Sequence, residues 1–252
     1  MFGTQYIFFK GKNEPWDKAE FRNALLQAVP YEELRKPFAV KAETFVYPLN
    51  GYPSVNGINE YDLEEAIDMM NEARQKYGID KDKKLPIVFA ITDSMKDWAD
   101  LLKKAWEPLG VELTVQTTQE GRYNSSIPLW SADLFVYSWI GDFADPIAFL
   151  ELYRGDSTLN VAGYKNPVYD NLLIQAAREE DYKEHYTLLA KAEQTLLDDG
   201  MIIPVSHPIS FNVINTDIIG GWKSNALDLH PLRYLYIKKP KIVELPNVVK
   251  AY

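Results

Sequence analysis

The sequence predicts an α/β domain built on one main sheet. Residues 85–91 and 111–117 are apolar runs typical of strands, and the segment between them, 94–109, has a helical pattern that Gly110 ends. A β-α-β unit with a helix of this length makes its two strands parallel. Another apolar run, 134–137, also lacks strict alternation, which indicates strands that helices cover on both faces.

The elements expected before this unit are a strand and three helices. Residues 4–10 alternate as a strand, and the helices open at Asp17, Tyr31 and Asp62. Asp17 and Asp62 are each followed three residues later by a glutamate, which is the spacing of a capping box. Gly78 is placed to end the third helix.

The loop between the second and third of these helices, 38–59, is rich in Pro, Gly, Asn and Tyr. A loop of this length is expected to be functional or to wrap over the domain. Beyond residue 150 the chain first has helical and then β-like patterns. The expected elements there are helices at about 167–178 and 182–197 and β-like runs at 201–203, 211–214 and 234–237.

Composition restricts the class of function. The chain has 252 residues, 46% of them hydrophobic, and a formal net charge of -9. This composition is that of a globular protein, and the lack of a basic surplus argues against nucleic acid as a partner. No stretch is long and apolar enough for a membrane span. The first ten residues do not have the pattern of a signal peptide, so the protein is cytoplasmic or the sequence begins downstream of its signal.

Metal and cofactor chemistry are not expected. There is no cysteine, which excludes thiolate metal sites, disulfides and cysteine nucleophiles. The three histidines lack metal-binding spacing. His185 lies in a polar stretch of helix and is expected to face solvent. His207 stands beside Pro208 at a strand break and is expected to face a cleft, and His230 lies in a loop.

Residues 139–146, Trp-Ile-Gly-Asp-Phe-Ala-Asp-Pro, form the most informative segment. They follow an apolar strand and precede a helical pattern, and ligands bind at such carboxyl ends of strands in open α/β sheets. Gly141 can turn the chain, Asp145 can cap the helix and Pro146 can take its first position. Asp142 has no such structural role and is the candidate for binding.

Several short motifs then stand in a fixed order along the chain. They are Glu14-Pro15-Trp16-Asp17, Tyr61-Asp62, Trp106 with Leu109-Gly110-Val111, Trp139-x-x-Asp142-x-x-Asp145-Pro146, Tyr164-Lys165-Asn166-Pro167, and Ala192-Glu193 before Ile203-Pro204-Val205. This ordered set resembles the C-terminal half of the peptide-binding proteins that serve ABC importers, a solute-binding family that includes oligopeptide, dipeptide, nickel and haem receptors.

The resemblance implies a periplasmic-binding-protein-like (type II) lobe with a mixed sheet and helices on both faces. Residues 1–252 would be a single C-terminal ligand-binding lobe with a core of about 11–210. Segments 1–10 and 211–252 would cross to and return from an N-terminal lobe that the sequence lacks. The implied partners are that lobe, a membrane permease, and a peptide or other small solute. The implied location of the parent protein, a lipoprotein in some members, is periplasmic or at the cell surface.

The resemblance also implies a set of ligand-binding residues. Trp139 would form a wall of the ligand cavity, and Tyr137, at the end of the preceding strand, is a second candidate. Asp142 matches the carboxylate that pairs with a peptide's α-ammonium, a charge-assisted bond that is strong in a dry cleft. Asn160 lies where contacts to a peptide backbone are expected, and His207 is the fifth candidate.

Two features leave the ligand open. The positions at which some oligopeptide receptors carry a basic clamp for the ligand carboxylate correspond here to Val136 and Met95, which have no charge. The alternatives to solute binding are an acid/base hydrolase that uses Asp142 and Asp145, and a stand-alone interaction module. An exposed apolar cleft face and unpaired tail strands also predict self-association.

Overall fold

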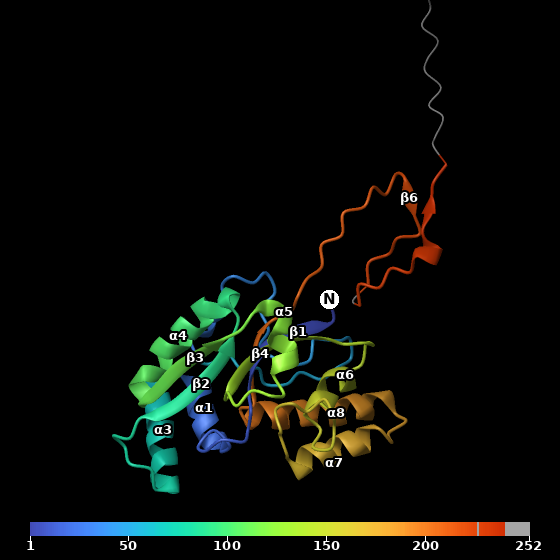
Figure 1. Ribbon diagram of the computed structural model, residues 1–252. Helices are drawn as coiled ribbons and strands as arrows, with labels where there is room; N and C mark the ends of the chain where they lie inside the picture. Colours follow the sequence, from blue (N-terminus) through green and yellow to red (C-terminus); the bar gives the residue numbers. More distant parts are fainter. Residues whose placement is uncertain (226, 240–252) are drawn as a thin grey trace, which may run out of the picture.

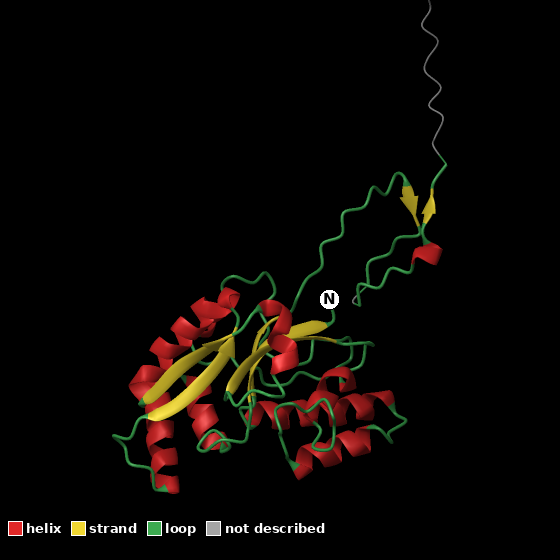
Figure 2. Cartoon of the chain, in the orientation of Figure 1, coloured by secondary structure: helices red, strands yellow, loops and turns green. Residues whose placement is uncertain are grey.

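The computed structural model describes residues 1–225 and 227–239. Its main sheet has five strands: β1 (Gly3–Phe9), β2 (Leu85–Ile91), β3 (Val111–Thr117), β4 (Leu134–Ile140) and β5 (Ile202–Ser206). Their order is β3-β2-β4-β1-β5. β2 is parallel to β3 and β4, whereas β1 is antiparallel to β4 and β5. The sheet is therefore mixed and has helices around it, which confirms the predicted fold class (Figure 2).

The helices form two groups along the sheet (Figure 1). They are α1 (Ala19–Gln27), α2 (Tyr31–Arg35), α3 (Leu63–Tyr77), α4 (Lys96–Trp106), α5 (Glu120–Ser126), α6 (Ile147–Leu150), α7 (Pro167–Ala176) and α8 (Tyr182–Asp198), with single 3-10 turns at Asp93–Met95, Glu107–Leu109, Glu151–Tyr153 and Leu232–Tyr234. α1, α3 and α4 lie toward the β2–β3 end of the sheet, and α6, α7 and α8 lie toward the other end. None of the described helices is both long and apolar enough to cross a membrane.

Of the two predicted capping boxes, only the N-cap bond of the second forms, because the backbone N–H of Asp62 donates to the carbonyl of Gln27 and not to Glu65. The Asp62 side chain accepts a hydrogen bond from the backbone N–H of Glu65 at 3.0 Å and caps α3, as expected. The prediction for Asp17 is wrong, because α1 begins at Ala19 and its N-cap residue is Lys18. The Asp17 carboxylate instead pairs with the ammonium of Lys18 at 2.6 Å.

Both faces of β1 are buried. On one face Tyr6 meets Phe45 edge-to-face at 4.9 Å, and Phe8 stacks on its cross-strand partner Phe135. Ile7 points to the opposite face and has no exposed surface. Because β1 lies between β4 and β5, it belongs to the sheet of this lobe.

A single buried carboxylate holds the long loop 38–59 against the lobe. Glu193, on α8, has no exposed surface. Its Oε1 accepts hydrogen bonds from the backbone N–H groups of Phe45 and Val46, both at 2.8 Å, and its Oε2 accepts one from the hydroxyl of Tyr52 at 2.8 Å. Burial raises the pKa of the Glu193 carboxyl from 4.5 to about 7.

After β5 the chain leaves the lobe as an extended arm (Figure 1). The arm ends in a small hairpin of β6 (Ile219–Gly220) and β7 (Tyr236–Ile237). The strand expected at 211–214 is wrong, since these residues pair with no other described strand and Val213 is 100% exposed. The apolar pattern is present, but no sheet edge is there to pair with it. The rest of the predicted returning segment, 240–252, lies outside the described residues.

Candidate functional site

The carboxyl ends of β2 and β4 lie at the same edge of the sheet because the two strands are parallel. From this edge the chain after β2 crosses through α4 to β3, whereas β4 lies on the other side of β2. Such a point, where connections leave in opposite directions, is where open α/β sheets bind ligands. β2 and β4 pair only at Phe89 with Leu134 and at Ala90 with Phe135, so the strands separate toward this edge.

A tyrosine hydroxyl fills the gap where β2 and β4 separate. Tyr123, on α5, donates to the carbonyl of Ala90 at 2.8 Å and accepts from the backbone N–H of Val136 at 2.8 Å. Val136, one of the two positions without a basic clamp, has 2% of its surface exposed and belongs to the core. Tyr123 was not identified from the sequence, since a lone tyrosine in a short helix gives no signal of this bridge.

The strand that carries the candidate residues is longer than predicted, because β4 continues beyond Tyr137 to Ile140 through pairing with β1. Tyr137 and Trp139 therefore point to the same face, and their rings stack with centroids 6.3 Å apart and planes at 23°. The Trp139 indole N–H donates to the carbonyl of Ala148 at 2.7 Å, which fixes the ring. Both side chains remain partly exposed.

The turn after β4 leaves Asp142 exposed at the sheet edge. Its carboxylate has no hydrogen bond or ion pair with any described residue. Gly141 N–H donates to the carbonyl of Phe2 at 2.8 Å, which holds the start of the turn against β1. The exposed position next to Trp139 is the one predicted for Asp142, and its role in binding stays a prediction.

Asp145 bonds to the start of α6 as predicted for a cap, but the N-cap residue of this helix is Pro146, one position later than expected. One carboxylate oxygen accepts from the backbone N–H of Ile147 at 2.9 Å, and the other lies 3.2 Å from Nε2 of His185. Both oxygens therefore have partners inside the lobe. The expectation that His185 faces solvent is wrong, because its side chain is only 19% exposed and its Nδ1 lies 2.8 Å from the carbonyl of Ala176.

Asn160 is engaged within its own loop. Its amide group donates to the carbonyls of Arg154 at 3.1 Å and Tyr164 at 2.8 Å, and its Oδ1 accepts from the Tyr164 N–H at 3.2 Å. No hydrogen bond among the described residues joins Asn160 to the Trp139–Asp142 turn. The structure thus gives Asn160 a loop-stabilising role and does not bring it together with the other candidates.

The expectation that His207 faces an open cleft is wrong. His207 is 6% exposed, and Tyr47 packs edge-to-face on its ring at 4.9 Å. Its Nδ1 lies 3.0 Å from the carbonyl of Gly3, so this nitrogen carries the proton. Burial lowers the pKa of His207, which favours the neutral ring. Pro208, which follows His207, indicated that the strand ends there, but it gave no information on the direction of the His207 side chain.

A cavity of about 660 Å³ opens at the same sheet edge, beyond the end of β2. Met95, the other position without a basic clamp, lines it together with an edge-to-face pair of Phe38 and Trp98 at 5.8 Å. Gln5 of β1 contributes an amide, and Lys36 contributes a cation. The sequence did not single out Phe38 or Trp98, because the two residues come from segments far apart in the chain.

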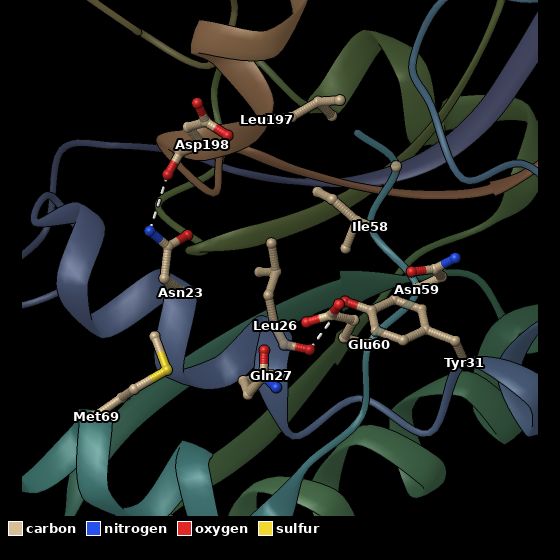
Figure 3. A pocket seen from close by; sticks show the side chains of 11 residues that line it. Asn23, Leu26, Gln27, Tyr31, Ile58, Asn59, Glu60, Met69, Leu197 and Asp198 are labelled. Carbon is tan, nitrogen blue, oxygen red and sulfur yellow. Dashed lines mark hydrogen bonds between the residues drawn. The ribbon is translucent and has the colours of Figure 1, made fainter. Parts of the chain in front are cut away.

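A smaller cavity of about 310 Å³ lies between α1, the loop at 57–60 and the end of α8 (Figure 3). The end of α8 precedes β5, whereas the candidate edge is where β5 ends, so this cavity is away from Asp142. Two of its polar side chains are already bonded within the lobe: Asn23 donates to the carbonyl of Asp198 at 2.8 Å, and the Tyr31 hydroxyl donates to the carbonyl of Leu26 at 2.9 Å. None of the residues predicted to bind ligand lines this cavity.

The turn that presents Asp142 is expected to be intolerant of a side chain at Gly141. A Cβ there would lie 2.6 Å from the Phe2 ring and 3.3 Å from Phe149, and both rings are fully buried. Gly141→Ala should therefore lower the free energy of unfolding by about 1–3 kcal/mol, as overpacking does. Gly121→Ala, where nothing lies within 4 Å of the added carbon, is the control and should be neutral or slightly stabilising. Equal urea midpoints for the two variants would contradict the tight fit at Gly141.

The fold is that of an α/β lobe of a solute-binding protein. The model of the bacterial extracellular solute-binding proteins, family 5 (middle region), matches residues 1–160. The chain belongs to this family, as the sequence motifs indicated.

Relatives and solved structures agree with this assignment. The chain is 26% identical over 251 residues to the dipeptide-binding protein DppE of Bacillus subtilis, covering 94% of this chain and 45% of that protein. It is 26% identical to the periplasmic oligopeptide-binding protein OppA of Salmonella typhimurium over 72% of this chain and 32% of the relative. The fold matches Haemophilus influenzae OppA, solved in complex with RPPGFSPFR, with a TM-score of 0.77 at 18% identity, over 95% of this chain and 49% of that one. The chain thus spans about half the length of these proteins or less.

Proposed function

We propose that this chain forms the peptide-binding lobe of a solute-binding protein that serves an ABC importer, and that Asp142 binds the α-ammonium of the peptide. The observation that carries the proposal is the exposed Asp142 carboxylate, which has no described partner and lies at the carboxyl edge of the sheet beside the stacked Tyr137 and Trp139. A free carboxylate in this position can bind a cation that every unmodified peptide carries.

The surroundings of Asp142 favour a peptide over a small ion. Tyr137 and Trp139 offer a flat aromatic wall. The 660 Å³ cavity has the volume of a small-molecule site, but it is lined by Gln5 of β1, whose side chain points to the opposite face of the sheet, so it is separate from this wall. Because Val136 and Met95 carry no charge, neither supplies a cation for the peptide's carboxylate. We therefore propose recognition of the amino end, with the length of the peptide left unrestricted by these two positions.

Relatives support peptides as the ligand class. DppE is named for dipeptides and OppA of Salmonella typhimurium for oligopeptides, and the Haemophilus influenzae structure holds a nine-residue peptide. A matching relative in Haemophilus influenzae is named a heme-binding protein, so members of this family bind more than one kind of ligand. The free carboxylate at Asp142 is the feature of this chain that favours peptides.

A binding role also fits the two carboxylates better than hydrolysis does. A general acid/base pair needs both groups available to the substrate. Asp145 is occupied by Ile147 and His185, which leaves Asp142 as the single free carboxylate of this turn. We therefore infer a binding protein and not an enzyme.

The extended arm supports a second lobe as a partner. Phe211, Leu232 and Ile237 are 86%, 81% and 77% exposed, which is unusual for large apolar side chains unless another surface covers them. We propose that residues 211–225 and 227–239 pack on a partner lobe that closes over the Asp142 edge, and that the complete protein works outside the cytoplasmic membrane, next to its permease. Self-association through the same residues stays a prediction.

The proposal predicts a specific loss in ligand titrations followed by NMR. One lobe leaves Asp142 in contact with water, where an ion pair contributes about 0–1 kcal/mol, so binding should be weak and Asp142→Asn should reduce it up to about fivefold. An N-acetylated peptide should bind wild type as weakly as the free peptide binds the variant. The variant should bind both peptides equally, because the coupling needs both charges.

Asp100→Asn is the matched control, since Asp100 is an exposed carboxylate on α4. This variant should retain the preference for the free amino terminus. If wild type binds free and N-acetylated peptides equally, or if Asp142→Asn keeps the preference, Asp142 is not the ammonium partner.

A further inference from the structure

His185 makes two hydrogen bonds whose partners can only accept. Its Nδ1 lies 2.8 Å from the carbonyl oxygen of Ala176, at the end of α7. Its Nε2 lies 3.2 Å from a carboxylate oxygen of Asp145, in the turn after β4. A carbonyl and an ionised carboxylate have no proton to donate, so each ring nitrogen must carry one. The two contacts together therefore require the imidazolium form of His185.

The Asp145 contact ties α8 to the turn that presents the candidate ligand residues. Asp145 lies three positions after Asp142, and its second oxygen holds the backbone of Ile147 at 2.9 Å. The next residue, Ala148, accepts the indole N–H of Trp139 at 2.7 Å. The position of the Asp145 carboxylate thus affects both the exposed carboxylate and the aromatic wall beside it.

We propose that His185 is a positioning residue for the ligand-binding turn, and that loss of its second proton releases one of its two bonds and loosens the turn. The inference rests on the proposed function only because it takes Asp142 as the ligand residue. The link between His185 and Asp145, which we call the tether, does not depend on that function. A neutral ring can donate to Ala176 or to Asp145 but not to both.

The charged residues next to His185 on its own helix are Asp181, Lys183 and Glu184, which are all exposed. Asp145 faces it from the turn, and α7 contributes the Ala176 carbonyl. On α8 the Tyr186 ring lies 6.0 Å from the imidazole, with Tyr182 bonded to Tyr186, and Tyr52 of the 38–59 loop packs on Tyr186. Among the described residues, His185 is the only cation paired with Asp145. Its proton is therefore the switchable charge at this contact.

The test is an NMR titration of the uniformly ¹⁵N-labelled chain from about pH 5.5 to 9. The ring nitrogens of His185 should show the doubly protonated form at low pH. The amide signals of Gly141, Asp142, Phe143 and Ala144 should shift with the same midpoint as the ring. In His185→Gln these shifts should disappear, whereas His230→Gln, which removes a histidine of the arm, should leave them unchanged.

A second variant keeps the test valid if His185→Gln folds poorly. In Asp145→Asn the side-chain oxygen can still accept from Ile147, and the side-chain N–H can donate to Nε2 of a neutral ring whose Nδ1–H still bonds Ala176. All partners are then satisfied without the second proton, so the turn amides should keep one position across the titration. A near-native spectrum elsewhere confirms that the variant is folded.

Two results would overturn the proposal: a His185 ring that stays singly protonated throughout, or turn amides that do not follow its titration. The outcome is separable from that for Asp142. If Asp142→Asn leaves peptide binding unchanged while the turn still follows His185, the proposed function fails and the tether stands. If peptide binding depends on Asp142 but the turn amides do not follow the titration of His185, the proposed function stands and the tether fails.

Discussion

Replacing Glu193 by alanine is expected to lower the free energy of unfolding by about 3–5 kcal/mol, a large part of the stability of an ordinary domain. The carboxylate accepts hydrogen bonds from the backbone of Phe45 and Val46 and from the hydroxyl of Tyr52. Alanine leaves these three donors without their acceptor, and each buried unsatisfied donor costs about 1–3 kcal/mol. The truncated side chain also leaves a cavity in a fully buried position.

Urea unfolding followed by circular dichroism measures this loss at constant pH. Glu184→Ala is the matched control, because Glu184 lies in the first turn of the same helix and is exposed. The control should change stability by less than about 0.5 kcal/mol. At about pH 4.5, where Glu193 is protonated in the folded protein, Glu193→Gln keeps one oxygen for the two backbone donors and should cost about 1 kcal/mol or less. Similar midpoints for the Ala and Gln variants would show that the hydrogen bonds are not what stabilises the loop.

The effect of Glu193→Ala should reach the candidate site. Phe45, which Glu193 anchors, packs edge-to-face on Tyr6 and on Phe149, and its carbonyl accepts the hydroxyl of Thr4 at 2.7 Å. Thr4 is the cross-strand partner of Trp139. A loop released at Glu193 would therefore loosen the packing behind the aromatic wall.

The parts of the fold that the sequence predicts are those set by local chemistry. The β-α-β unit of β2, α4 and β3 follows from strand length, helix length and Gly110, which adopts φ +74° where the prediction needed a helix stop. Asp62 caps α3, and Asp145 bonds to the first residue of α6, because an acidic side chain before a helix reaches the backbone N–H groups two or three residues on. Each of these signals depends on neighbours close in sequence.

The parts that could not be predicted depend on distant segments. The neighbours of Glu193 in the sequence gave no sign that it binds a distant loop, because its partners Phe45 and Val46 are 148 and 147 residues away. The contact between His185 and Asp145 could not be predicted for the same reason. Asp145 is 40 residues away, and the polar neighbours of His185 on its helix gave no sign of it. The prediction of a strand at residues 211–214 is wrong for another reason. A β-like sequence pattern becomes a strand only where a partner strand can pair with it.

Stability should fall by about 3 kcal/mol through Glu193 alone as the pH rises from about 4.5 to about 7. The folded protein raises the pKa of this carboxyl from 4.5 to about 7, because burial disfavours the charged form more than its three hydrogen bonds favour it. In this window the folded state keeps a proton that the unfolded state has lost. Stability therefore decreases with pH, by about 1.4 kcal/mol for each pH unit. Below about pH 4.5 both states are protonated and the contribution is fully present.

The contribution of Glu193 is isolated by comparing wild type with Glu193→Gln, whose side chain cannot ionise, in urea unfolding at several pH values. Other carboxylates titrate equally in both proteins, so the difference in free energy of unfolding should change by about 3 kcal/mol across the window, in the direction that disfavours wild type at high pH. This sign is opposite to that of a carboxylate in a salt bridge, which stabilises the folded state as the pH rises. A difference that stays constant with pH, or that favours wild type at pH 7, would mean that the hydrogen bonds from Phe45, Val46 and Tyr52 outweigh burial and keep Glu193 ionised.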